Sequence, residues 1–398
     1  MHSYATPFNI VRSVEPDAPV FCFRPERVTA AATWFKENFP AQPFYAVKAN
    51  PGVHVLDALW EAGINSFDVA SIDEIELIGT RFPTARMAFL HPVKNRRAIS
   101  RAYHEFGVRI FVTDTLDELT KILEETGYAA DLTIIVRVAV SCDGASLPLA
   151  GKFGANADDA AEILREARRY ADELGVSFHV GSQAMKPTAW VTAMADVSRI
   201  IIQAGVTVDI VDVGGGFPSI YADSPPPALA DYVDRVESSF ENMFVLENAE
   251  LWCEPGRALV AEAESLLLRV ELAKPGAIYL NDGAYGALYD AVHERWKFPM
   301  RPISGDGRKM GDRLVEYTVY GPTCDSTDTF PEKVWLPAGM TEGDYIEFGN
   351  IGAYGRAMMT RFNGFGVTET AIVQDAPFAS LYEPLGAEIV AFGSKITL

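Results

Sequence analysis

The sequence contains few cysteines, and they are far apart. The four, Cys22, Cys142, Cys253 and Cys324, include no C-x-x-C pair and no spacing typical of a metal site. A disulfide framework or a zinc motif needs closer or regularly spaced thiols. The pattern excludes a disulfide-stapled secreted fold. It predicts free thiols in a reducing compartment and no bound metal.

Long apolar runs and excess positive charge are also missing. No run of the sequence reaches the ~18 apolar residues that a membrane-spanning helix needs. The start, MHSYATPFNI, lacks the basic patch and apolar core of a signal peptide. Lysine and arginine total 34 against 54 acidic residues, a formal net charge of −20, so nucleic acid and anionic membranes are poor partners. We therefore expect a cytoplasmic protein that binds neither.

The chain does contain a regular alternation of short apolar runs and longer amphipathic stretches. Its 398 residues, 48% hydrophobic and 22% charged, suit a globular protein of two domains. Strands are predicted at 43–48, 66–70, 86–91, 108–113, 132–138, 176–181, 206–216 and 249–256. The intervening stretches have helical periodicity, as at 156–175. Eight buried strands, each followed by a helix, predict an α/β fold, a (β/α)₈ barrel.

The pattern changes after about residue 257. Strand-like runs separated by turn residues continue at 258–273, 276–283, 314–322, 333–339 and 343–350. They predict a C-terminal all-β domain, and the apolar run at 18–23 is expected to pair with it. The predicted organisation is an N-terminal segment (1–24) that joins the β domain, the barrel (25–257) and the β domain (258–398).

Polar residues close the predicted barrel strands, where the chemistry of such barrels lies. They are Lys48, Asp68, His91, Arg137, His179, the run DVGGGFP at 212–218 and the run EPGR at 254–257. Successive glycines at 214–216 can present backbone N–H groups to a phosphate, although a flexible turn has the same composition. Arg257 offers a guanidinium fork suited to phosphate oxygens, and Glu254 adds a carboxylate.

These residues together indicate a phosphate beside a cationic ring. Pyridoxal phosphate (PLP) needs a lysine to bond, an acidic partner for its ring nitrogen and a phosphate cradle. Lys48, Glu254 and the glycines with Arg257 supply all three. The competing interpretation of Lys48 is a strand end that reaches water, and a lone histidine such as His179 is often structural.

At this point the chain resembles a known family. The motifs YAVKANP, FDVASIDEIEL, FHVGSQ, DVGGGFP, EPGRALV, NDGAYGALYD, GPTCDSTD and RFNGF run in the family's order from about residue 44 to 364. They resemble the ornithine decarboxylase group of the fold type III PLP-dependent decarboxylases. The resemblance implies an alanine racemase-like PLP-binding barrel with a C-terminal β domain, as the periodicity predicts.

The resemblance implies a role for each matching residue. Lys48 bonds the cofactor, His179 stacks on its ring and Glu254 holds the ring nitrogen, while Arg137 lies near the phenolic oxygen. Asp68 and Glu74 support the lysine. The full cofactor set is Lys48, Asp68, Glu74, Arg137, His179, Ser182, Gly214, Gly215, Gly216, Glu254, Gly256, Arg257 and Tyr354. Within it, Ser182, Gly216, Arg257 and Tyr354 match the phosphate site.

The resemblance also implies a shared substrate site in a homodimer. Cys324, the expected proton donor to the α-carbon, and Asp325 match a pair supplied by the partner subunit. The substrate residues are Tyr289, Asp290, Asp325, Tyr354 and Phe362. Two carboxylates in a desolvated pocket suit a terminal ammonium, although Asp325 alone also fits a turn. The catalytic set is Lys48, His179, Glu254 and Cys324.

The predicted reaction is decarboxylation of a basic L-amino acid, first L-ornithine to putrescine, a step of polyamine biosynthesis. Lysine or dual specificity is the main alternative, because one methylene is worth only about 1–3 kcal/mol of discrimination. Arginine needs more room; an inactive homologue or a racemase is a further alternative. The sequence departs from the group at HPVK (91–94), at 141–151 and across 291–320, so the chain length of the substrate stays open.

Overall fold

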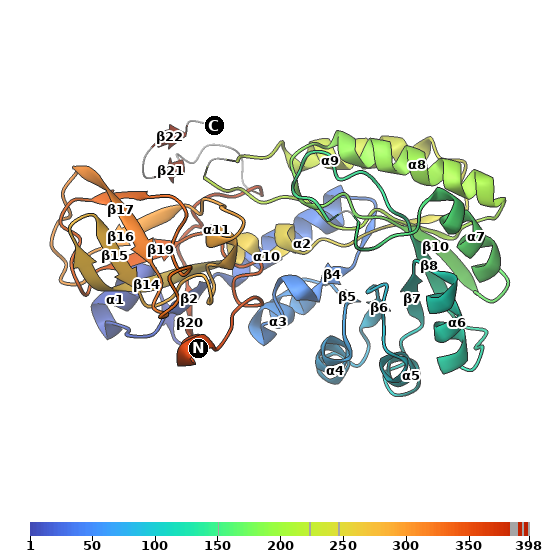
Figure 1. The fold of residues 1–398 in the computed structure, drawn as a ribbon, viewed down its shortest axis with the longest axis horizontal. Helices are drawn as coiled ribbons and strands as arrows, with labels where there is room; N and C mark the ends of the chain where they lie inside the picture. The colour runs from blue at the N-terminus through green and yellow to red at the C-terminus, as the bar shows by residue number, and fades with distance from the viewer. Residues whose placement is uncertain (150, 223, 246, 383–388, 392–393, 397–398) are drawn as a thin grey trace.

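The computed structural model describes residues 1–149, 151–222, 224–245, 247–382, 389–391 and 394–396. Figure 1 shows a barrel and a strand-rich part side by side along the longest axis. Within the described residues, no helix is both long and apolar enough to cross a bilayer.

The barrel is a ring of parallel strands. Its order is β3-β13-β12-β10-β8-β7-β6-β5-β4. β3 and β4 are separated only by Phe44, so they act as one strand that closes the ring through β13 on one side and β5 on the other. The bounds are β3 Gln42–Pro43, β4 Tyr45–Ala46, β5 Ser66–Val69, β6 Arg86–Phe89, β7 Ile110–Thr113, β8 Thr133–Arg137, β10 Glu173–Ser177, β12 Ile210–Asp212 and β13 Glu250–Cys253. The predicted (β/α)₈ architecture is confirmed.

Helices cover the outside of this ring (Figure 1). They are α2 Pro25–Asn38, α3 Val53–Glu61, α4 Ile72–Arg81, α5 Arg96–His104, α6 Leu116–Glu125, α7 Ala157–Ala167, α8 Thr188–Ala204 and α9 Leu229–Glu241. Local sequence explains several starts. The Ser71 and Thr115 side chains accept hydrogen bonds from backbone N–H groups three residues on, which caps α4 and α6.

One predicted boundary was wrong. The stretch 156–175 has helical periodicity, but α7 ends at Ala167 and β10 already begins at Glu173. Tertiary pairing overrides the local pattern, because Glu173–Ser177 bonds to β8 on one side and its last three residues to β12 on the other. His179 therefore lies two residues beyond its strand rather than at its last position.

The strand-rich part is built on the long strand β14 (Glu264–Lys274), which begins where the barrel ends. Its other strands are β1 Ser3–Tyr4, β2 Val20–Phe23, β15 Ala277–Leu280, β16 Met300–Ile303, β17 Leu314–Tyr320, β18 Val334–Pro337, β19 Tyr345–Phe348 and β20 Glu369–Val373. The short strands β9 (Ala145–Leu147) and β11 (Ser182–Ala184) pair beside the barrel, and β21 (Ile389–Ala391) pairs with β22 (Ser394–Ile396). β2 pairs with both β14 and β20. The remaining elements are α1 Pro7–Val14, η1 Val47–Ala49, α10 Arg257–Val260, η2 Ala261–Ala263, α11 Tyr289–Val292 and η3 Phe362–Gly364. The first part of the run predicted as strand from residue 258 is thus helical.

Candidate active site

Lys48 stands in the turn η1, directly after β4, at the mouth of the barrel. Its side chain is 44% exposed, and Nζ donates to Asp68 Oδ2 at 2.9 Å. Burial lowers the pKa of Lys48, but the carboxylates of Asp68 and Glu254 outweigh it and raise that pKa above its ordinary value. Lys48 lines a cavity of ≈ 440 Å³ at this mouth of the barrel.

Glu74 supports this pair from the next helix. Its backbone N–H donates to Ser71 Oγ at 3.2 Å, and its Oε2 accepts from the Ala70 N–H at 2.6 Å, a reciprocal cap at the start of α4. Burial raises the pKa of Glu74 to about 7, with Asp68 adding to the shift and Lys48 opposing it.

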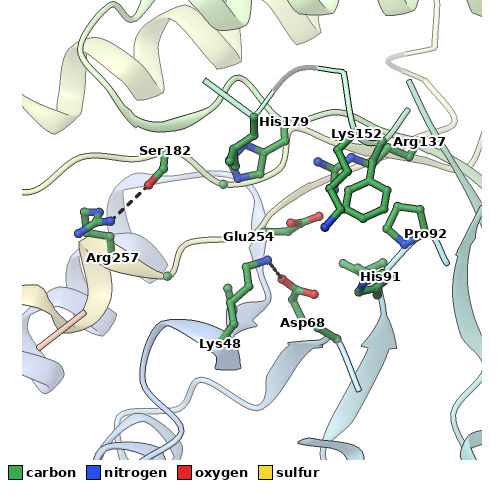
Figure 2. A pocket seen from close by; sticks show the side chains of 18 of the residues that line it. Lys48, Asp68, His91, Pro92, Arg137, Lys152, His179, Ser182, Glu254 and Arg257 are labelled. Carbon is green, nitrogen blue, oxygen red and sulfur yellow. Dashed lines mark hydrogen bonds and ion pairs between the residues drawn. The ribbon is translucent and has the colours of Figure 1, made fainter. Parts of the chain in front are cut away.

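His179 lies across the cavity from Lys48 (Figure 2). Its Nδ1 accepts the Gly181 N–H at 3.0 Å, so the neutral ring carries its proton on Nε2. Burial, with Arg137 and Lys48, lowers the pKa of His179 well below its ordinary value. The imidazole is therefore neutral, and its Nε2 lies close to the glycine run, since a Cβ on Gly215 would lie 3.2 Å from it.

The glycine run forms a tight wall at one end. Gly214 and Gly216 have φ of +67° and +105°, and Cβ atoms there would lie 2.0 and 2.4 Å from backbone oxygens. No other residue fits either position. Beside them Arg257 Nη2 points to Ser182 Oγ at 3.4 Å (Figure 2).

Arg257 is held rigidly by groups from several elements. Nη1 donates to the Tyr221 hydroxyl at 2.7 Å and lies 3.6 Å from Asp290 Oδ2. The guanidinium carbon lies 4.1 Å from the ring centroid of Trp296 and 4.8 Å from that of Tyr354. Its Nε is buried without a hydrogen-bond partner in the described structure. A fixed guanidinium with spare donor capacity suits an anionic phosphate.

The donor set fits PLP. An amine, an acid and a stacking imidazole converge on one cavity, with a guanidinium, a hydroxyl and a glycine wall at its end. The predicted residues that line it are Lys48, Asp68, Arg137, His179, Ser182, Gly215, Gly216, Glu254, Gly256, Arg257 and Tyr354.

Comparison with known proteins agrees with this geometry. Residues 26–261 match the pyridoxal-binding domain of the pyridoxal-dependent decarboxylases. The chain belongs to this family. Relatives include a lysine/ornithine decarboxylase from Selenomonas ruminantium, 31% identical over 88% of this chain and 88% of that protein. Mus musculus ornithine decarboxylase is 30% identical over 88% of this chain and 79% of its own.

A solved structure extends the similarity to the whole fold. The Paramecium bursaria Chlorella virus arginine decarboxylase bound to agmatine has a TM-score of 0.80 and 27% identity, covering 92% of this chain and 98% of that one. The predicted family, the barrel with a C-terminal sheet domain, the decarboxylase class and the PLP cofactor are thereby confirmed.

Several predicted residues of the decarboxylase lie outside the cavity. Cys324 is exposed, and its Sγ lies 3.1 Å from Asn363 Oδ1. Asp325 Oδ2 accepts from the Tyr285 hydroxyl at 2.6 Å, and the Tyr285 ring lies 4.7 Å from that of Phe362. These five residues form a cluster at the surface of the β domain, which we call the Cys324 cluster; three of them are exposed, whereas Tyr285 and Asp325 are half-buried. Tyr285 and Asn363 were missed, because only the fold gives them a role.

Tyr289 and Asp290 also differ from expectation. Both begin the short helix α11, and neither lines the cavity within the described structure. The Tyr289 ring lies 4.4 Å from that of His293. Asp290 contacts Arg257, so its predicted place at the distal amine of the substrate stays a prediction. Gly214 and Glu74 are not among the described residues that line the cavity, and they lie next to residues that do.

Sequence reasoning missed other lining groups of the decarboxylase. His91 ends a predicted strand, and the sequence gives it no role, yet it lines the cavity, and its Nδ1 accepts the Val93 N–H at 3.0 Å. Leu149, Lys152 and Phe153 come from the loop after β9. No periodic signal marks them, because a loop residue reaches a cavity only through the fold.

Proposed function

We propose that this decarboxylase converts L-ornithine to putrescine and CO₂. The main support for decarboxylation is the cavity at the mouth of the barrel, where Lys48 is paired with Asp68. The same cavity is lined by His179, by Glu254 and, at one end, by Arg257. The basic substrate is supported by the carboxylate of Asp325 on the Cys324 cluster. Lysine is the main alternative, and arginine stays open.

The lining residues divide the work of holding the cofactor. Lys48 bonds PLP, Glu254 faces its ring nitrogen, His179 covers its ring, and Arg257 with Ser182 holds its phosphate. Bound there, PLP supplies the electron sink that makes loss of CO₂ feasible. Glu74, Arg137 and Tyr354 complete this proposed site.

Side chains of the protein itself are proposed to accept and donate the protons of the reaction. Lys48 is cationic in the folded protein, so it needs a base before it can act as a nucleophile, and Asp68 Oδ2 at 2.9 Å is in reach. His179 is a poor competitor for that proton, because burial, Arg137 and Lys48 lower the pKa of its imidazole.

We also propose a homodimer in which the Cys324 cluster of one subunit completes the cavity of the other. Cys324 Sγ then gives a proton to the α-carbon, while Asp325 receives the terminal ammonium. The exposure of the cluster outside its own cavity supports this arrangement. Mixing inactive Lys48→Ala and Cys324→Ala subunits should restore about a quarter of the sites. No restored activity would contradict shared sites.

The test of the substrate is a decarboxylation assay with ornithine, lysine, arginine and diaminopimelate at matched concentrations. Ornithine should give the highest kcat/KM, with CO₂ and putrescine as products. A higher value for lysine or arginine would correct the substrate and keep the reaction. Racemisation without CO₂ would refute the reaction class.

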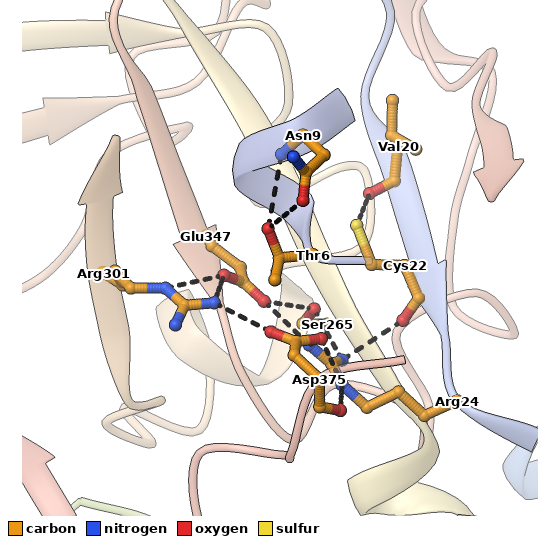
Figure 3. A network of polar contacts seen from close by, with 9 residues as sticks. All are labelled: Thr6, Asn9, Val20, Cys22, Arg24, Ser265, Arg301, Glu347 and Asp375. Carbon is orange, nitrogen blue, oxygen red and sulfur yellow. Dashed lines mark hydrogen bonds and ion pairs between the residues drawn. The ribbon is translucent and has the colours of Figure 1, made fainter. Parts of the chain in front are cut away.

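The proposed domain division keeps residues 1–24 with the β domain. Support comes from β2, which pairs with β14, and from Arg24, which contacts Asp375 at 2.8 Å, Ser265 at 2.9 Å and Glu347 at 3.2 Å (Figure 3). Amides of β2 should exchange hydrogen together with those of β14. The cytoplasmic location stays a prediction.

A further inference from the structure

A buried carboxyl group lies behind Glu254 that no predicted role uses. Asp212 ends β12 and is 1% exposed, while Glu254 follows the neighbouring parallel strand β13 and is 5% exposed. Glu254 lines the cavity; among the described lining residues Asp212 does not occur. Asp212 is therefore placed to act on the cavity through Glu254.

Backbone contacts lock the two carboxyl groups together. The Gly214 N–H donates to Asp212 Oδ1 at 2.9 Å, and the Glu254 N–H donates to the Gly214 carbonyl at 2.9 Å. Only glycine fits between the two groups, because position 214 has a φ of +67° and a Cβ there would lie 2.0 Å from the Phe178 carbonyl oxygen. Asp212 and the backbone of Glu254 are thus tied to the same glycine, and, against the larger effect of burial, a hydrogen bond from the Glu254 side chain lowers the pKa of Asp212.

The geometry requires a proton between them. Asp212 Oδ2 is buried, and no donor from another described residue reaches it. Two ionised carboxylates cannot share a buried site, so a proton on Glu254 is the donor that satisfies Oδ2. Burial raises the pKa of Asp212 to about 6, and burial, Asp212 and Asp68 raise that of Glu254 well above its ordinary value.

The other charged groups around Asp212 and Glu254 do not remove the requirement for a shared proton. Lys48 and Arg137 face Glu254 and lower its pKa, whereas Asp68 opposes them, and the Cys253 thiol is itself kept neutral by burial. The pair therefore carries one proton and one negative charge.

We propose that Asp212 is a positioning residue that keeps a shared proton on Glu254, available to the ring nitrogen of PLP. This inference rests on the proposed role of Glu254. If the proton were to pass from Glu254 Oε to the nitrogen, both carboxylates would be ionised and the total charge of the centre would be unchanged. The positive charge gained by the nitrogen would offset the repulsion that keeps one carboxyl group protonated without PLP, and the two anions would in turn favour protonation of the nitrogen at alkaline pH.

Asp212→Asn tests this with little change of shape. The amide oxygen can still accept from Gly214, but its NH₂ donates to Glu254, which then stays ionised and has no proton to give. PLP affinity, measured by equilibrium dialysis, should fall about tenfold at pH 8.5, the equivalent of one pKa unit, and less at pH 6.5. Asp209→Asn, the same change just before β12, is the matched control and should leave PLP affinity within about twofold.

A double-mutant cycle with Glu254→Gln separates positioning from packing. Asp212→Asn should not weaken PLP binding further in the Glu254→Gln background. An equal loss in both backgrounds, or no loss in either, would overturn the proposal. Failure of the unaltered protein to bind PLP would instead refute the proposed function.

The protein without cofactor gives a second, independent measurement. Infrared spectra at pH 8 should show a protonated carboxyl band that both Asp212→Asn and Glu254→Gln abolish. Persistence of that band in either variant would also overturn the shared proton.

Discussion

Replacing Trp296 by leucine should weaken PLP binding through Arg257. The indole centroid lies 4.1 Å from the guanidinium carbon, and Arg257 is 5% exposed, so this is a desolvated cation–π contact. Such contacts are worth about 2 kcal/mol, and each 1.36 kcal/mol is tenfold in affinity. Because this contact orients the guanidinium before the phosphate arrives, its full ~2 kcal/mol is the upper bound of the loss, so the PLP dissociation constant should rise by up to about 30-fold.

The assay compares PLP with pyridoxal, which lacks the phosphate, in equilibrium dialysis. Trp296→Leu should weaken PLP binding and leave pyridoxal binding nearly unchanged, since Arg257 is proposed to meet only the phosphate. Trp335→Leu is the matched control, because Trp335 lies on β18 and is 44% exposed. An equal loss of affinity for PLP and pyridoxal, or an unchanged affinity for PLP, would refute the proposal that Trp296 orients Arg257 for the phosphate.

Three further outcomes are expected. The raised pKa of Glu74, about 7, means that the folded state binds more protons than the unfolded state between about pH 4.5 and 7. The free energy of unfolding of the cofactor-free protein should fall as pH rises through that window, and urea titrations of Glu74→Gln should show a smaller fall. Glu264 is fully buried and lies 2.9 Å from His54 Nε2, so Glu264→Ala should lower the free energy of unfolding by about 3 kcal/mol in the same titrations. Tyr285→Phe removes the 2.6 Å hydrogen bond to Asp325 and should raise KM for ornithine severalfold in steady-state kinetics without changing PLP affinity; an unchanged KM would remove Asp325 from substrate binding.

The barrel could be predicted because its strands are buried on both faces. They appear as short apolar runs whose last residues face the mouth, which is how Lys48 and Glu254 were found. The boundary within 156–175 was predicted wrongly because the short strand β10 follows helix α7 closely and continues its spacing of apolar residues. Only its pairing with β8 and β12 identifies it as a strand.

The surroundings of Arg257 could not be predicted, since they join distant segments. Tyr221, Asp290 and Trp296 reach it from a barrel loop, a short helix and the region whose sequence matched little. The motif DVGGGFP contains Asp212, but the sequence does not predict its burial beside Glu254, which depends on the register of β12 and β13.

The contact between Asp290 and Arg257 changes how selectivity for the terminal ammonium is understood. A carboxylate 3.6 Å from a buried guanidinium is already partly neutralised, so it attracts a second cation less strongly than a free one. Among the residues that the structure describes, the Asp325 carboxylate accepts hydrogen bonds only from Tyr285 and Thr327, which are neutral, so no neighbouring cation offsets its charge there. We therefore expect recognition of the ammonium to depend mainly on Asp325, and the preferred chain length to depend on the distance from Lys48 to Asp325 across the proposed interface. Ornithine and lysine would be distinguished by the docking of two subunits, which no single segment of the sequence encodes.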